Sequence, residues 1–147
     1  MKYSFEYTPP APYMTVKFTK PFSDHSLELK AKLDTGADIT VLPQHVIDKL
    51  GLIPSSLVSV LSFDGKKVQR YTYFVNISFQ NFEYRMVEVV GAERKDALLG
   101  RDILNRLKTI LDGKTWTSPS LIHEYKPDFS TSSTTLSKPQ TIGICAH

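Results

Sequence analysis

The chain has 147 residues, of which 41% are hydrophobic and 22% charged, and its net charge is +3 at neutral pH. This length suffices for one domain with its own core but not for two of usual size, and the composition is typical of a soluble globular protein. The mild charge, without runs of Lys or Arg, excludes a basic nucleic-acid-binding arm, and the single cysteine, Cys145, excludes a disulfide framework or a thiolate metal site.

No targeting or membrane-spanning segment is recognisable in the sequence. The first residues, MKYSFEYTPP, lack the continuous apolar core of a signal peptide, and no stretch is long enough to cross a bilayer. We therefore expect a cytoplasmic protein whose partners include neither a membrane nor a nucleic acid.

Short strands dominate the predicted structure. After an extended N-terminal arm, alternation of apolar and polar residues predicts strands over residues 13–18, 27–33, 57–63, 68–74, 76–79 and 82–90. Asp64-Gly65 favours a hairpin turn between the third and fourth of these strands, and Gln80-Asn81 favours another between the last two.

Two short helices interrupt the strands. Pro43 suits the first position of a helix and Gly51 suits its end, so residues 44–50 are predicted to form one helix. A second helix is predicted over residues 102–108, where apolar residues share one helical face, and a final hairpin over residues 110–116.

The chain divides into a domain and a tail. Residues 1–117 carry the periodic segments and are predicted to form one all-β domain. Residues 118–147 include the Ser/Thr-rich stretch DFSTSSTTLS and are predicted to be a tail, largely disordered in isolation.

The stretch LDTGAD, residues 33–38, is the strongest candidate for a functional site. Asp, Thr and Gly all favour turns, so the triplet could be an ordinary turn. However, Asp34 ends a strand with a clear alternation and falls on its polar side, so its carboxylate projects from a rigid scaffold. Gly36 allows close backbone approach to a ligand, and Thr35 supplies a hydroxyl. These are the parts of an aspartic protease site, where two neighbouring carboxylates share a proton and activate a water.

The segment LDTGADITVL, residues 33–42, resembles the active-site segment of retropepsins, the single-domain aspartic proteases of retroviruses and their relatives. The later segment LLGRDIL, residues 98–104, is similar to a second family motif, and Asp64-Gly65 lies where the tip of the family's flap is expected. The resemblance covers residues 13 to 116 and is closest in form to bacterial members. It implies a closed all-β barrel with two short helices that acts as a symmetric dimer.

The resemblance also implies roles for individual residues. Asp34 would act as general base and acid toward the water, Thr35 would bond across the dimer axis, and Gly36 would offer its carbonyl to the substrate backbone. Ala37 and Asp38 would line the substrate cleft.

Other residues would support or cover that site. Leu98, Leu99 and Gly100 would form the wall beneath the catalytic loop, although as bare sequence they are simply core. Arg101 would pair with Asp38 in a partly buried ion pair, the alternative being an ordinary surface pair.

The flap of this chain differs from the glycine-rich retroviral pattern. Its tip, SFDGKK, has one glycine and two lysines, which favours a stiffer and more polar turn. Asp64 and Gly65 are candidates to contact substrate. Phe63 could contact substrate or pack inside the hairpin.

The chain supplies one Asp-Thr-Gly loop, whereas this chemistry needs two. The second carboxylate would therefore come from another copy in a homodimer with the site on its two-fold axis. No cofactor or metal is expected, and the only partners predicted are a second copy and a polypeptide substrate. The predicted function is aspartic endopeptidase; the alternative is a dimeric peptide-binding module on the same fold without useful turnover.

Overall fold

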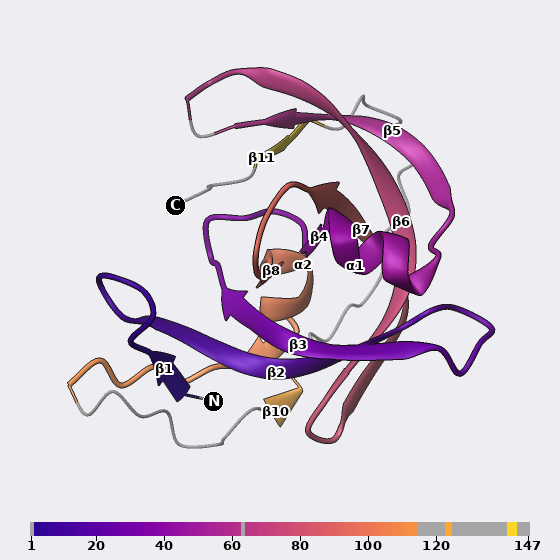
Figure 1. Ribbon diagram of the computed structural model, residues 1–147. Coiled ribbons are helices and arrows are strands. Elements are labelled where there is room, and N and C mark those ends of the chain that lie inside the picture. Colours follow the sequence, from indigo (N-terminus) through magenta and orange to yellow (C-terminus); the bar gives the residue numbers. More distant parts are fainter. Residues whose placement is uncertain (1, 63, 115–122, 125–140, 144–147) are drawn as a thin grey trace, which may run out of the picture.

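The structure is a computed structural model that describes residues 2–62, 64–114, 123–124 and 141–143. Short strands and two helices make up this part of the chain (Figure 1). In chain order they are β1 (Lys2–Ser4), β2 (Ala11–Thr19), β3 (Ser26–Leu33), β4 (Val41–Pro43), α1 (Gln44–Leu50), β5 (Pro54–Leu61), β6 (Lys67–Phe79), β7 (Phe82–Ala92), β8 (Ala97–Leu99), α2 (Arg101–Leu104), β9 (Leu107–Lys108), β10 (His123–Glu124) and β11 (Thr141–Gly143). The predicted all-β class with two short helices is confirmed.

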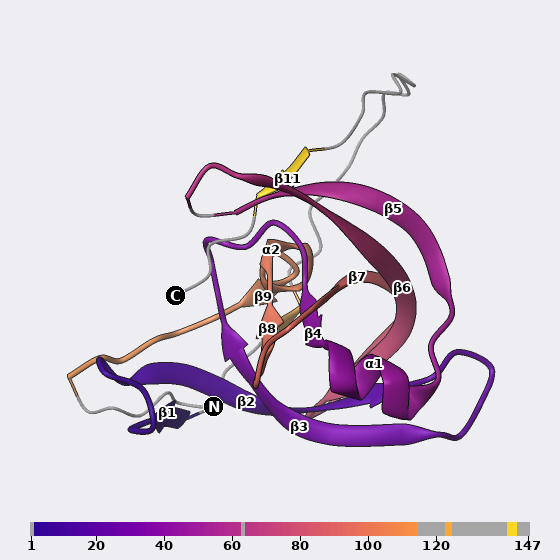
Figure 2. The same ribbon diagram turned by 45° about the horizontal axis from the view of Figure 1, so that its top comes forward.

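One strongly curved sheet organises the fold. Its strand order is β1-β2-β3-β8-β4-β7-β6-β5-β11, and β2 pairs with β6 as well as with β3. The β2–β6 pairing joins strands that are otherwise separated by four others in the sheet, so the strands from β2 to β6 form a ring (Figures 1 and 2). Val16, Phe18, Val75 and Ile77 are fully buried inside this ring, which makes it the main core.

The centre of the sheet brings together the two sequence motifs, LDTGADITVL and LLGRDIL. β3 pairs in parallel with β8, with Leu33 opposite Leu99. β8 in turn pairs antiparallel with β4 through Val41 and Leu98. The loop between β3 and β4, which carries Asp34, therefore lies directly against the end of β8.

Helix α1 occupies the residues that the sequence predicts. Pro43 precedes its first turn with extended backbone, and Gly51 ends it with a left-handed φ of 60°. The Gly51 amide donates to Asp48 O over 3.0 Å, which closes the last turn. Val46, Ile47 and Leu50 face the core. Neither α1 nor α2, the helices in the described residues, is long and apolar enough to span a membrane.

The prediction for the second helix is wrong in length. Helix α2 covers only Arg101–Leu104 and gives way to a turn and then to β9. Ile103, Leu104 and Leu107 are all buried, as the apolar spacing suggested. A turn followed by a strand places these side chains in the core as well as a longer helix would, and a pattern of seven residues cannot distinguish the two arrangements.

The strand-rich middle is also simpler than predicted. The two strands predicted over residues 68–74 and 76–79 are one continuous strand, β6. A register shift against β7 lies between Val75 and Ile77, where Asn76 Oδ1 accepts the Met86 amide over 2.9 Å. The bulge absorbs the polar residue without ending the strand. The turn at Gln80-Asn81 is confirmed, with Gln80 at a φ of 51°.

The hairpin of β5 and β6 arches over the loop between β3 and β4 in both views (Figures 1 and 2). Its turn is confirmed at Asp64-Gly65: the Ser62 amide donates to Lys66 O over 2.8 Å, and Gly65 has a φ of 78°. Strand β5 runs from residue 54 to 61, so it begins and ends earlier than the predicted strand over 57–63.

The two ends of the chain add strands to the sheet. The N-terminal arm, predicted to be extended, forms β1, which pairs with β2 of the same chain, and Tyr7 donates a hydrogen bond of 2.5 Å to Asp96 Oδ2. Burial, followed by this bond, raises the pKa of Tyr7 to about 12. Of the predicted tail, residues 123–124 pair with β9 and residues 141–143 with β5, while the rest lies outside the described residues. The second strand of the predicted hairpin over 110–116 also lies outside them.

Candidate active site

A tight turn over residues 34–37, here named the Asp34 turn, follows the buried end of β3. The amide of Asp34 donates to Leu99 O over 3.0 Å, and the amide of Ala37 donates to Asp34 O over 3.3 Å. The amide of Gly36 donates to Asp34 Oδ1 over 2.9 Å. The half-buried carboxylate of Asp34 is thereby oriented by the backbone of its own turn, while Thr35 and Gly36 are exposed beside it. An acid held by main-chain bonds on a strand end is positioned more accurately than one on a free loop.

Helix α2 is joined to the Asp34 turn at its first residue. The amide of Arg101 donates to Ala37 O over 2.8 Å, and its guanidinium forms an ion pair with Asp38 Oδ1. Ala37 is fully buried. The predicted pair between Arg101 and Asp38 therefore forms, but the side chains are 51% and 37% exposed in the single chain. At that exposure the pair contributes little stability, at most about 1 kcal/mol, and the main-chain bond is the firmer link.

A buried hydrogen-bond network lies beneath the turn. Thr40 is fully buried, and its hydroxyl donates to Asp102 Oδ1 over 2.9 Å while accepting the Gly100 amide over 3.2 Å. Burial raises the pKa of Asp102, against the opposing effect of the hydrogen bonds from Thr40. Asp102 Oδ2 is buried and has no hydrogen-bond partner among the described residues. The network connects Thr40, in the segment after the Asp34 turn, to Gly100 and Asp102 at the start of α2.

Gly100 is required by the close approach of two backbones. A Cβ atom at this position would lie 2.6 Å from Ile39 C and 2.7 Å from Ile39 O. Both are main-chain atoms, so the contact cannot be relieved by turning a side chain. Gly100 therefore allows the end of β8 to pack against the segment that follows the Asp34 turn.

The wall below the turn is apolar. Leu98 and Leu99 are almost completely buried in β8, as predicted, and Leu98 belongs to a small second core with Val41, Val60 and Val90. Val60 comes from β5, so this cluster joins the wall to the hairpin above it. Ile39 also belongs to the cluster.

The tip of the hairpin is solvated. Asp64 forms an ion pair of 3.0 Å with Lys66, and the bond from the Lys66 side chain is the main cause that lowers the pKa of Asp64. A Cβ atom added at Gly65 would have no other atom within 4 Å, so this position faces open space. Phe63, which was predicted either to contact substrate or to pack inside the hairpin, lies outside the described residues.

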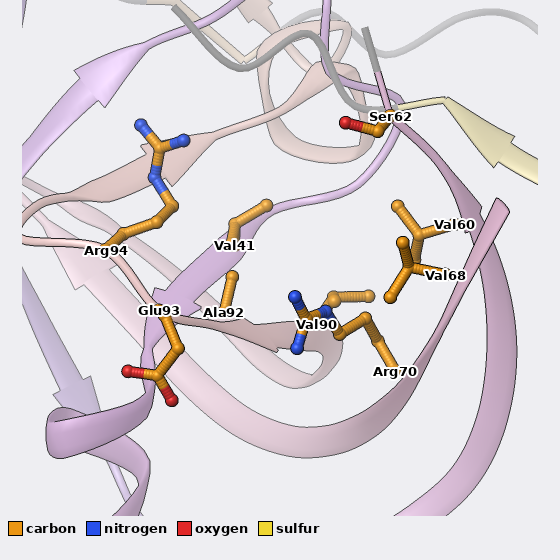
Figure 3. A pocket seen from close by; sticks show the side chains of 9 residues that line it. All are labelled: Val41, Val60, Ser62, Val68, Arg70, Val90, Ala92, Glu93 and Arg94. Carbon is orange, nitrogen blue, oxygen red and sulfur yellow. The ribbon is translucent and has the colours of Figure 1, made fainter. Parts of the chain in front are cut away.

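A hollow of about 190 Å³ lies between the wall and the inner face of the hairpin (Figure 3). Val41, Val60, Val68 and Val90 supply most of its apolar lining. Arg70 and Arg94 reach it with charged side chains, as does Glu93. Sequence reasoning missed the hollow, Thr40 and Arg70. The alternation of Val68, Arg70 and Thr72 along β6 could have placed Arg70 on one face, but not shown which face was inside.

Within the part of the chain that the structure describes, no group of three or more His, Cys, Asp or Glu side chains could hold a metal ion. The polar groups around the Asp34 turn are carboxylates, hydroxyls and backbone amides. This arrangement can orient a water and a peptide backbone.

Comparison with known proteins identifies the class. The family model for aspartyl proteases matches residues 22–103, which contain the Asp34 turn, the hairpin and α2, so the chain belongs to the aspartyl protease family. Its general function is accordingly that of an aspartic protease. Comparison with curated proteins returned no match.

Solved structures support the same fold. EIAV protease in complex with the inhibitor HBY-793 is 23% identical, with a TM-score of 0.53 over 71% of this chain and 92% of that one. A retropepsin-like aspartic protease from Rickettsia conorii is 17% identical, with a TM-score of 0.49 over 76% of this chain and 82% of that one. The retroviral protease-like domain of Ddi1 from Leishmania major is 15% identical, with a TM-score of 0.44 over 79% of this chain and 95% of that one. The match to EIAV protease, together with the family model, shows that the chain has the retropepsin-like fold.

Proposed function

We propose that two copies of the chain form a symmetric homodimer that hydrolyses internal peptide bonds of polypeptides. The observation that carries the proposal is the Asp34 turn, in which a carboxylate at a strand end is fixed by the Gly36 amide and backed by Leu99. Membership of the aspartyl protease family supports the same chemistry. The sequence has one such turn, so a second carboxylate requires a second copy.

In the proposed mechanism the two Asp34 carboxyl groups share one proton. The ionised group takes a proton from a water while the water oxygen forms a bond to the peptide carbonyl carbon, and the protonated group gives its proton to the carbonyl oxygen, so that a diol forms. As the diol collapses, the now ionised carboxylate takes a proton from one of its hydroxyl groups, the C–N bond breaks, and the other carboxyl gives its proton to the leaving amine. Because one group must be ionised and the other protonated, activity is expected to be bell-shaped in pH and greatest on the acidic side of neutral.

The neighbouring residues hold the substrate and the subunits. Thr35 bonds across the dimer axis, and the Gly36 carbonyl accepts an N–H of the substrate backbone. Asp38 lines the site, and Arg101 keeps it in place through the ion pair, whereas Ala37, which was expected to line the site too, is fully buried and supports the turn from within. Asp64 and Gly65 cover the substrate from the hairpin.

The pairing along the edge of β5 is an argument that the substrate binds as an extended strand. Residues 141–143 lie along this edge as a parallel strand, with Ile142 opposite Val60. This edge of the hairpin thus accepts an additional strand through main-chain hydrogen bonds, which is a common mode of peptide recognition. A polypeptide bound in this way would run between the hairpin and the Asp34 turn.

The test compares wild type with Asp34→Asn on a diverse peptide library at mildly acidic pH. Wild type is expected to cleave, and Asp34→Asn to lose cleavage while keeping its fold and its sedimentation behaviour. Asp24→Asn, at an exposed position in the β2–β3 turn, is the matched control and should cleave as wild type does. Equal activity of wild type and Asp34→Asn would overturn the mechanism. A dimer that binds but cleaves no peptide would instead support the binding module.

A further inference from the structure

The inner face of the β5–β6 hairpin is mainly apolar and carries one charged side chain, that of Arg70, besides the polar Ser62. Val60 lies opposite Val68 and Val58 lies opposite Arg70 in the β5–β6 ladder. Since alternate residues of a strand face the same side, Val58, Val60, Val68 and Arg70 share one face. That face lines the hollow, so Arg70 projects among valines rather than into open solvent.

Figure 3 shows how Arg70 lies. Its side chain extends across the hollow from β6, and its guanidinium ends beside Val90 and Ala92. The Arg70 side chain makes no hydrogen bond or ion pair in the part of the chain that the structure describes. A guanidinium has five N–H donors, and a half-buried one without partners favours an anionic ligand.

The other charges of the hollow do not satisfy Arg70. Glu93 is exposed, and Figure 3 shows its carboxylate pointing away from the Arg70 guanidinium. Arg94 points to the opposite side, and its Nε is buried without a hydrogen-bond partner among the described residues. Of the three charged side chains that line the hollow, Arg70 is the one that extends across it, which gives the hollow a positive charge.

The hollow belongs to the same region as the Asp34 turn. Its floor includes Val41, which pairs with Leu98. The next residue of β8, Leu99, accepts the hydrogen bond of the Asp34 amide. A polypeptide that reaches Asp34 under the hairpin therefore passes this hollow with one of its side chains. A volume of about 190 Å³ suits one side chain, since sites for whole ligands are roughly 300–1,000 Å³.

We propose that Arg70 is a specificity-determining residue that selects polypeptides carrying an aspartate or glutamate side chain in the hollow. The carboxylate accepts two N–H bonds from the guanidinium, a geometry that arginine matches well. The valine walls exclude water and strengthen the attraction relative to an exposed pair. The inference rests on the proposed function, because it assigns the substrate class of that same site.

The test uses full-length protein and peptides with acetylated and amidated ends, so that only side chains carry charge. Peptides with Asp or Glu are compared with matched peptides carrying Asn or Gln at each position in turn. Wild type is expected to favour the acid over the amide in kcat/KM by about tenfold to a hundredfold at one position. Arg70→Gln should lose this preference, Arg70→Lys should keep part of it, and Arg70→Glu should favour Lys or Arg there.

Two controls separate charge recognition from packing and folding. Arg70→Met keeps an apolar stem against the valines, so retention of the acid preference in this variant would overturn the proposal. Arg85 is exposed on β7 and pairs with Glu83, so Arg85→Gln should leave the preference unchanged. Thermal unfolding of each variant should match wild type, because the Arg70 side chain has no partner to lose in the described structure.

Binding measured by fluorescence anisotropy in the Asp34→Asn background separates the two proposals. Cleavage without an acid preference in wild type leaves the protease proposal intact and overturns the role of Arg70. Acid-dependent binding that is lost in Arg70→Gln, with no cleavage by wild type, supports the role of Arg70 and overturns the protease proposal. Absence of both cleavage and acid-dependent binding overturns both.

Discussion

The hydroxyl of Thr40 donates a hydrogen bond of 2.9 Å to Asp102 Oδ1, although the two residues lie 62 positions apart in the chain. The same oxygen accepts the Gly100 amide, so one buried hydroxyl joins the segment after the Asp34 turn to the residues on both sides of Arg101. Arg101 contacts the turn directly, through the Ala37 carbonyl and Asp38. The geometry of the Asp34 turn therefore depends on a network that does not touch the substrate.

Thr40→Val tests how much the Thr40 hydrogen bonds contribute to the free energy of unfolding. The substitution keeps the shape of the side chain but leaves the Gly100 amide and the Asp102 carboxyl group without the hydroxyl. We expect the free energy of unfolding to fall by about 2–4 kcal/mol, measured by urea denaturation. Thr40→Ser keeps the hydroxyl and should lose only about 1 kcal/mol through its missing methyl group. Equal losses in the two variants would show that the methyl group, and not the hydroxyl, matters at this position.

Asp102→Asn tests the consequence of burial for pH dependence. Because burial raises the pKa of Asp102 above its ordinary value of 3.8, the folded protein holds this proton more tightly than the unfolded chain does. Its contribution to stability is present below that value and is lost as the pH rises through the raised pKa. The asparagine variant lacks this loss, so its stability relative to wild type should increase from about pH 3 toward neutral pH.

The measurement is a series of urea denaturation curves across that pH range for wild type and Asp102→Asn. Asp24→Asn, at an exposed position, serves as the control and should run parallel to wild type. If the Asp102→Asn curve also runs parallel to wild type, the carboxyl group does not titrate differently in the folded and unfolded states.

Gly100→Ala tests the close approach of the two backbones. The φ of Gly100 is −85°, which alanine adopts freely, so any cost comes from the contacts of the new Cβ with Ile39. We expect a loss of about 2–3 kcal/mol in the free energy of unfolding and a marked loss of activity. Gly113→Ala is the matched control, since a Cβ there has no atom within 4 Å. A stable and active Gly100→Ala protein would mean that β8 and the motif loop can separate without harm.

Deletion of residues 141–147 tests the accessibility of the β5 edge. Since residues 141–143 occupy this edge, they compete with a peptide that binds there as a strand. A chain ending at Gln140 should show a KM about two- to tenfold lower with little change in kcat. Ile142→Pro, at the middle residue of the paired strand, disfavours its pairing with β5 and should act in the same direction. An unchanged KM in both proteins would place the substrate elsewhere on the hairpin.

Local patterns predicted the parts of this fold that depend on neighbouring residues. The alternation of β3, the helix bounded by Pro43 and Gly51, and the turn at Asp64-Gly65 all follow from residues within a few positions of one another. The length of α2 did not follow from neighbouring residues. Leu107 reaches the core from a strand, and its position fits the helical spacing equally well. The predicted gap between strands 68–74 and 76–79 is instead a bulge within the continuous β6, between Val75 and Ile77.

The candidate site was predictable in its motif but not in its support. The resemblance of the Asp-Thr-Gly segment placed Asp34 and Arg101 in one region, and the structure brings their segments together through Ala37 and Asp38. The role of Thr40 required knowledge of which distant residue lies beneath it. Arg70 could be assigned to one face of β6, but both faces of the hairpin carry apolar residues, since Leu57 and Tyr71 are exposed on the other. Only the tertiary structure identifies the inner face.

The bond between the Asp34 amide and the Leu99 carbonyl also has a consequence for biosynthesis. A ribosome makes the chain from its N-terminus, so the acidic motif emerges long before the strand that holds it. A nascent or prematurely terminated polypeptide that stops short of Leu99 contains the acid yet lacks its scaffold. The proposed site can therefore form only after most of the domain has been translated.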